Sequence, residues 1–157
     1  MRKTYDRVMS REGFVDLYDN VITSVKVRLT ADEIRALHTT PQTLISAPGP
    51  NKFITIDQAI AYLDYSGGAF TGGNDLEIRV TNGAGDVVVE DGFASAFLNG
   101  VADAISVETG TAYWGEVTRS LDQPIVAYIP VADPGGAAST STLTLILMYK
   151  IIKVYNI

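Results

Sequence analysis

The sequence predicts an all-β protein: a jelly-roll-like β-sandwich of about eight strands, with one short helix and an extended N-terminal arm. Three observations favour this fold. Short segments alternate apolar and polar side chains, which is the period of a half-buried strand. Turns rich in glycine and proline separate these segments. The chain has 157 residues, 46% of them hydrophobic and 19% charged, which suits one domain with its own core.

We expect residues 1–20 to form the arm and residues 21–157 to form the sandwich, because no repeat or linker divides the second range. A jelly roll buries the edges of many short strands in two facing sheets. The longest apolar run, Leu143 to Ile152, is about half as long as a membrane helix requires, so we expect no membrane partner. The sequence has no cysteine, which excludes a disulfide scaffold, a thiolate zinc site and a cysteine nucleophile.

The charge of the chain is uneven, although its net value is −6. Residues 1–11 hold four basic side chains against one acid, which gives +3, and residues 12–157 hold eight against seventeen, which gives −9. An acidic body repels nucleic acid, so no nucleic-acid partner is expected. A basic arm suits contact with a neighbouring protein, and a solvated terminus is the alternative. The candidate contact residues are Arg2, Lys3, Tyr5, Arg7 and Arg11.

The segment from Val21 to Thr30 alternates cleanly and predicts the first strand of the sandwich. A capping box follows it, because Thr30 and Glu33 have the spacing at which each side chain can bind the other's backbone N–H group. Leu29 and Ile34 have the spacing of a hydrophobic staple around this cap. The sequence therefore predicts a helix of two turns after Thr30.

The stretch LISAPGPNKFITI holds two prolines, a glycine and a lysine between two apolar runs. A phosphate-binding loop needs a glycine, four residues and then Gly-Lys-Ser/Thr, leading from a strand into a helix. Gly49 and Lys52 do not have that spacing, and the prolines lack the N–H groups that hold a phosphate. We interpret the stretch as a corner between a strand at Leu44–Ala47 and a longer strand at Lys52–Tyr65.

The longer strand is apolar on both faces, which is typical of a central strand or of one covered by a partner chain. A helix from Ile56 to Tyr65 is the alternative. Simple alternation places one set of side chains on one face, Ile54, Ile56, Ile60 and Tyr62, and another set on the other, Phe53, Ala59, Ala61 and Leu63.

The rest of the chain predicts further short elements separated by turns. The expected strands are 76–80, 87–89, 104–108, 113–118, 125–129 and 142–155, with a hairpin turn at 82–86, a helical turn at 93–98 and loops at 66–74 and 133–141.

No group of residues predicts a catalytic, metal or cofactor site. His38 is the only histidine, so a histidine-rich metal site is excluded, and we expect it at the surface or at a helix end. The loops at Gly72–Asp75 and Asp133–Gly136 offer oxygen ligands for calcium but lack the spaced acids of an EF-hand, and turn chemistry explains both.

Two weaker chemical alternatives concern sugars. Glycoside hydrolysis needs two carboxylates about 5–10 Å apart, and the candidates are Asp57, Asp64, Glu108 and Glu116. Stacking on sugar rings needs exposed aromatic side chains, and the candidates are Tyr62, Tyr65, Phe70, Tyr113 and Trp114. Aromatic residues of a sandwich are more often part of its core.

A longer segment resembles one that recurs in tailed-bacteriophage virion proteins. It runs VKVRLTADEIRALHTTPQTLISAPGPNKFITIDQAIAYLDYSGGAFTGGNDLEIRV, and LTLILMYKII near the end resembles the last strand of those proteins. Its features are a strand, an LTADEI helix start, an LISAPGPNK corner, an LDYSGGAFTGG loop and another strand. The resemblance covers most of residues 25–152 and includes no catalytic residue.

The resemblance implies a small jelly roll without enzymatic activity, used as a capsid decoration (cement) protein or as a module of a head fibre, tail fibre or tail tip. Its expected partners are the major capsid protein and further copies of itself, as a homotrimer, with no small-molecule substrate. Its expected place is the capsid exterior of a virion assembled in the host cytoplasm. The alternatives are a carbohydrate-binding, host-recognition module and, less directly, a polysaccharide-degrading enzyme.

Overall fold

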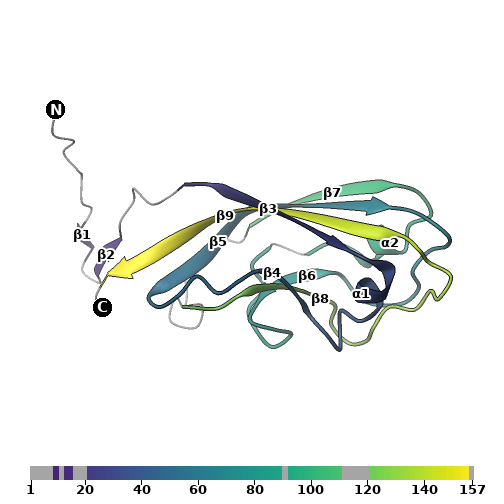
Figure 1. The fold of residues 1–157 in the computed structure, drawn as a ribbon, viewed down its shortest axis with the longest axis horizontal. Helices are drawn as coiled ribbons and strands as arrows, with labels where there is room; N and C mark the ends of the chain where they lie inside the picture. The colour runs from purple at the N-terminus through teal and green to yellow at the C-terminus, as the bar shows by residue number, and fades with distance from the viewer. Residues whose placement is uncertain (1–8, 11–12, 16–20, 90–91, 111–120, 156–157) are drawn as a thin grey trace.

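The computed structural model describes residues 9–10, 13–15, 21–89, 92–110 and 121–155. In it the chain forms two facing antiparallel sheets with two short helices (Figure 1). The all-β sandwich predicted from the sequence is therefore confirmed. Successive elements from residue 21 onward alternate between the two sheets, so each sheet is built from strands that are not consecutive in the chain.

The larger sheet contains the long strands β5 (Lys52–Asp64) and β9 (Thr142–Tyr155), which lie side by side at its centre. Strand β3 (Thr23–Leu29) pairs with the free edge of β9, and β7 (Ala104–Thr109) pairs with the free edge of β5. The order across this part of the sheet is thus β3-β9-β5-β7. The expectation that residues 52–65 form a central strand is confirmed, and the alternative helix over residues 56–65 is wrong.

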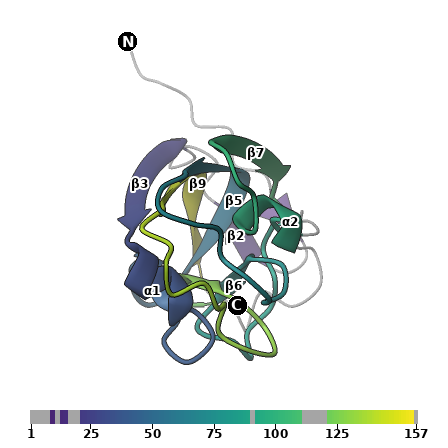
Figure 2. The same ribbon diagram turned by 90° about the vertical axis from the view of Figure 1, so that its right-hand side faces the viewer.

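The smaller sheet has the order β4-β8-β6 and faces one side of the larger sheet (Figures 1 and 2). Its strands are β4 (Gln42–Ile45), β8 (Ile125–Tyr128) and β6 (Glu77–Val80). The segment 87–89 contributes single bridges rather than a regular strand: Arg79 pairs with Val87, and Val89 pairs with Gly110. In Figure 2, α1 (Ala31–Arg35) lies on the β3 side of the sandwich and α2 (Ser95–Leu98) on the β7 side.

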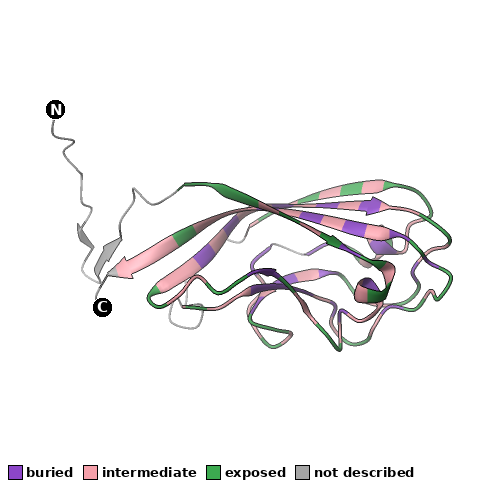
Figure 3. Ribbon diagram, in the orientation of Figure 1, coloured by how far each residue is buried: buried purple, intermediate pink, exposed green. Residues whose placement is uncertain are grey.

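Apolar side chains from both sheets form one core between them. Figure 3 shows that both sheets carry stretches of buried residues. Buried leucines of β9 alternate with half-buried residues, as the period of two predicts. Phe70 and Phe93, which lie outside the named strands, are among the largest fully buried side chains. Phe70 is 1% exposed and is therefore a core residue rather than a sugar-stacking one.

The predicted capping box is present at the start of α1, between Thr30 and Glu33. The two residues of the predicted staple, Leu29 and Ile34, are both buried. The regular helix spans only five residues and continues as turns to Thr39, so it is shorter than the two turns expected. The helical turn expected at 93–98 is α2, a second short helix.

A β-bulge in β5 changes which of its side chains face the core. Pairing with β9 shifts between Ile56 and Gln58, so Asp57 is an extra residue in the strand. The shift moves every later residue to the opposite face from the one that simple alternation predicts. The face assignment made from the sequence is therefore wrong: the buried side chains are Ile54, Ile56, Ala59, Ala61 and Leu63.

The corner between β4 and β5 uses the left-handed backbone conformation at Gly49 (φ +95°) and Asn51 (φ +58°). The backbone N–H of Gly49 donates to the Asp122 carboxylate at 2.8 Å, and the N–H of Asp122 donates to the carbonyl of Lys52 at 2.8 Å. These bonds join the corner to the turn that precedes β8. The interpretation of LISAPGPNK as a strand corner is confirmed.

Two short strands lie within the range expected to form the arm. Strand β1 (Met9–Ser10) pairs with β2 (Gly13–Val15), and β2 pairs with the last residues of β9. The arm of residues 1–20 stays a prediction, and the five contact residues proposed in it lie outside the part of the chain that the structure describes. No helix among the described residues is long and apolar enough to cross a bilayer.

Candidate assembly surface

The outer face of the larger sheet, which points away from the smaller sheet, carries an unusual number of apolar side chains. Pairing registers place its residues in three rows across β3, β9, β5 and β7. The rows are Lys26–Ile146–Ile60–Val107, Arg28–Thr144–Tyr62–Ile105 and Ser24–Met148–Gln58–Thr109. We call these twelve residues the outer face.

Strand β7 has the reverse of the polarity expected for a strand that covers a core. Its apolar residues Ile105 and Val107 point outward and are 68% and 51% exposed. Ser106 and Glu108 are on the other face, half-buried, where the Ser106 hydroxyl donates to the Glu108 carboxylate at 3.0 Å. Exposed apolar residues that form a contiguous patch are typical of a surface that contacts another protein.

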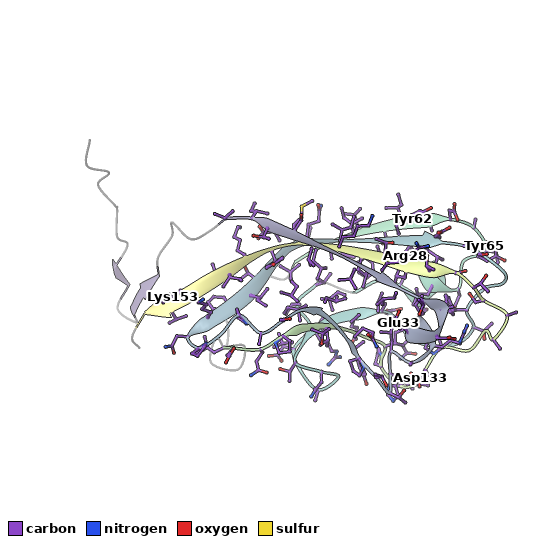
Figure 4. All side chains as sticks on the ribbon, viewed as in Figure 1. Arg28, Glu33, Tyr62, Tyr65, Asp133 and Lys153 are labelled. Atoms are coloured by element: carbon purple, nitrogen blue, oxygen red, sulfur yellow. The ribbon has the colours of Figure 1, made fainter. Side chains whose placement is uncertain are left out.

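The edges of the outer face carry opposite charges. On the β3 edge Lys26 and Arg28 are exposed, and Arg28 contacts the Asp64 carboxylate at 3.5 Å. Just before β7, Asp103 accepts a hydrogen bond from the backbone N–H of Tyr65 at 2.9 Å. Figure 4 labels Arg28, Tyr62 and Tyr65 at this end of the sheet.

The pKa of the Tyr62 phenol reflects the negative charges at this end of the outer face. The charge of Asp103 is the largest cause that raises the pKa of the Tyr62 phenol, followed by partial desolvation and the charge of Asp64. A negative neighbour disfavours the phenolate, so the hydroxyl stays protonated well into the alkaline range. A phenol is a hydrogen-bond donor at neutral pH in any case, and the raised pKa extends this role to higher pH.

Of the four carboxylates considered for glycoside hydrolysis, the three in the described part of the chain each contact a different partner. Asp57 forms an ion pair with Lys150 at 2.8 Å, Asp64 contacts Arg28, and Glu108 binds Ser106. Glu116 lies outside the described residues. Each described acid therefore has a structural partner of its own.

The two loops considered for calcium use their acids to bind backbone groups. The Asp75 carboxylate accepts from the N–H of Ser95 at the start of α2, at 2.6 Å. The Asp133 carboxylate accepts from the N–H groups of His38 and Thr39 and from the Thr39 hydroxyl. In the described part of the chain, no three His, Cys, Asp or Glu side chains are grouped so that they could hold a metal ion.

His38 lies just after α1, as expected for a histidine near a helix end, and it contacts the end of β8. Its Nδ1 atom is 3.0 Å from the carbonyl oxygen of Ile129 and 3.2 Å from the hydroxyl of Tyr128. The guanidinium of Arg79 lies over the Tyr128 ring, 5.5 Å from its centre, and donates to the carbonyls of Gly83 and Gly85. These contacts tie the smaller sheet to its flanking loops.

Sequence reasoning missed Ile105 and Val107, although their alternation with polar residues was visible. Alternation predicts that one face is apolar, and the default assignment of that face is inward. Only the register of β7 against β5 shows that it points outward. Of the aromatic candidates, Tyr62 is a half-buried residue of the outer face and Tyr65 is half-buried just after the end of β5, whereas Tyr113 and Trp114 lie outside the described residues.

Comparisons with known proteins add one structural likeness. No protein-family model matches the chain, and no curated protein matches it. A solved structure described as the capsid of Ralstonia phage GP4 is similar over 83% of this chain and 84% of that one, with 19% sequence identity and a TM-score of 0.40. A likeness this low carries no argument about fold or function.

Proposed function

We propose that this chain is a non-enzymatic structural protein of a bacteriophage virion, and specifically a jelly-roll decoration protein that binds across subunits of the major capsid protein on the outside of the head. The observation that carries the proposal is the segment from Val25 to Val80, whose sequence resembles tailed-phage virion proteins. In the structure its strand, capped helix, corner, central strand and glycine-rich loop follow one another in the order read from the sequence.

The strand order supports the jelly-roll part of the proposal. Strands from β3 to β9 alternate between a sheet of order β3-β9-β5-β7 and a sheet of order β4-β8-β6. Such alternation is what results when a long antiparallel hairpin folds over on itself into two layers, as in a jelly roll. The segment 87–89 bridges to β6 at Arg79 and lies where a fourth strand of the smaller sheet belongs.

The chemistry of the described side chains supports a binding role. The carboxylates of Asp57 and Asp64 are paired with Lys150 and Arg28, and that of Asp133 binds backbone N–H groups, while Ile105 and Val107 expose apolar surface. A decoration protein acts by covering and joining its neighbours, so it needs surface of this kind rather than a reactive group. Many weak contacts on an ordered shell then add up through avidity.

The basic segment of residues 1–11 is the proposed anchor to acidic surface on a neighbouring subunit. Deleting residues 1–11 should lower the occupancy of the protein on shells of the major capsid protein, measured by co-sedimentation. A charge-neutral variant of the same length, with Arg2, Lys3, Arg7 and Arg11 replaced by glutamine, separates the loss of charge from the loss of chain. Full occupancy with both variants would eliminate the arm as the anchor.

A host-recognition module that binds sugars is the second candidate, favoured by Tyr62 and Tyr65 beside the carboxylate of Asp103. Aromatic rings with adjacent acids are a common way to hold a sugar. A glycan array distinguishes the two functions. Binding to a defined glycan that is lost in Tyr62→Ala, with no binding to capsid shells, would replace the decoration function with this one.

A further inference from the structure

Strand β7 directs its larger apolar side chains to solvent instead of to the core, which favours coverage of the outer face by another protein surface. The inner face of β7 contributes Ala104, Ser106 and Glu108, whereas Ile105 and Val107 are directed to solvent. Around them, Ile60 and Ile146 continue the apolar surface to the centre of the sheet. Burying such a patch is favourable, by roughly 25 cal/mol for each Å² of apolar surface removed from water.

We infer that the outer face packs against the outer face of a second copy of this chain, as a two-fold dimer whose axis runs parallel to the strands. Sheets that face one another in this way pack about 10 Å apart with their strands nearly aligned. The inference depends on the proposed function only for its setting in a virion, since the contact is a property of the isolated chain.

The distribution of charge favours a second copy and selects this axis. Lys26 and Arg28 lie on the β3 edge, and Asp103 lies at the opposite edge, just before β7. A two-fold axis parallel to the strands stacks the β3 edge of each copy on the β7 edge of the other, so Arg28 approaches the second copy's Asp103. An axis perpendicular to the strands stacks β3 on β3, where two pairs of basic side chains repel one another.

The same axis matches the apolar residues of the central row. Ile60 on β5 faces Ile146 on β9 of the second copy, because the two central strands exchange places. Val107 on β7 faces the aliphatic part of the second copy's Lys26 on β3. Long basic side chains cover apolar surface with their methylene groups while the charge stays in water.

The size of the outer face sets the strength of the contact. Four strands about 4.8 Å apart and three rows about 6.7 Å apart cover roughly 400 Å² of sheet. A standard stable interface buries about 800 Å² on each partner, so the contact is expected to be weak and concentration-dependent. It gives a dimer in place of the homotrimer that the family resemblance implies, and copies held on a shell would form it more completely than free ones.

Sedimentation equilibrium of the full chain over a range of concentrations tests the contact. Val107→Lys places a charge opposite the second copy's Lys26 and should weaken dimerisation at least tenfold. Adding Lys26→Glu to that variant should restore dimerisation to within about threefold of the original. In one chain Val107 and Lys26 lie on opposite edges of the sheet, about 14 Å apart, so this rescue must act between chains.

Val131→Lys is the matched control, because Val131 is 76% exposed but follows β8 of the smaller sheet. It should leave dimerisation unchanged, and circular dichroism should show the same β spectrum for all variants. A chain that stays monomeric, a trimer, a Val107→Lys variant that dimerises normally, or a double variant without rescue would each overturn the inference. The proposed function fails separately, by loss of binding to capsid shells in a chain that still dimerises.

Discussion

The Glu33 carboxylate accepts a hydrogen bond from the backbone N–H of Thr30 at 2.7 Å, and the Thr30 hydroxyl accepts one from the backbone N–H of Glu33 at 3.4 Å. This reciprocal pair starts α1 and fixes the exit of β3, the strand that forms one edge of the outer face. The Thr30 hydroxyl also donates to Glu33 at 2.8 Å. Lys26 and Arg28 lie in the same strand, where pairing with Ile146 and Thr144 of β9 sets their register.

Replacing Thr30 with alanine should lower the free energy of unfolding by about 1 kcal/mol, because the first turn of α1 loses its cap. Urea unfolding at pH 7 measures the change. Thr39→Ala, at the other end of the helical turn, is not a matched control because its hydroxyl binds Asp133. Thr23→Ala at the exposed start of β3 is the better control and should change stability by less than about 0.5 kcal/mol.

The cap should also make stability depend on pH. Hydrogen bonds from the Thr30 backbone and then from its hydroxyl hold the pKa of Glu33 below its ordinary value of 4.5. A carboxylate with a lowered folded-state pKa contributes stability that is complete above its unfolded pKa and is lost as the pH falls through the folded one. The difference in unfolding free energy between the original chain and Glu33→Gln should therefore shrink from pH 6 to pH 3, and a constant difference would contradict the cap.

Asp133, the single acid of the described loop between β8 and β9, should contribute strongly to stability. Its carboxylate receives hydrogen bonds of 2.8, 3.1 and 3.0 Å from His38 and Thr39, which join the loop to the turn after α1. Partial burial would raise the pKa of Asp133, but these bonds outweigh it and bring the pKa below its ordinary value of 3.8. Asp133→Ala should cost about 1.5–3 kcal/mol at pH 7 by thermal or urea unfolding.

The isosteric Asp133→Asn keeps one acceptor oxygen and should lose less stability than the alanine variant. Because the folded-state pKa is lowered, the contribution of Asp133 is present above pH 4 and disappears as the pH falls through the folded pKa. Equal stability of Asp133→Ala and the original chain at pH 7 would show that the loop does not depend on this carboxylate.

Gly110 should tolerate no side chain, because its backbone passes directly over the bulge of β5. Its N–H donates to the carbonyl of Asp57 at 3.1 Å, and an added Cβ would lie against the carbonyl oxygen of Ile56. Gly110→Ala should therefore separate β7 from β5 at a cost of about 3 kcal/mol or more. Gly68→Ala, whose new Cβ meets only ordinary contacts, should change the unfolding free energy by less than about 1 kcal/mol.

The sequence predicted those parts of the fold that depend on local chemistry. The capping box, the proline-glycine corner and the alternation of β3 and β9 each depend on residues close together in the chain, and all are confirmed. The bulge at Asp57 was not predictable, because an extra residue in one strand is defined only against the register of its partner. This one extra residue exchanges the inward and outward faces of β5 for the residues that follow it.

The outer face was predictable only in part. Residues 53–65 and 142–155 carry apolar side chains on both faces, which indicated that both faces of these strands are covered. In the structure, one face of each strand packs into the core between the two sheets. The outward direction of Ile105 and Val107 depends on long-range pairing between β5 and β7, which one sequence does not encode locally. The charged edges of this face likewise come from strands more than seventy residues apart in the chain.

The most direct test of the proposed function is a binding isotherm of the purified chain on shells assembled from the major capsid protein of the phage that encodes it. The account predicts saturable binding at a fixed ratio of chains to capsid subunits, with shells that then resist heat or denaturant better than bare ones. Shells that bind none of the protein at concentrations where it is folded would contradict it.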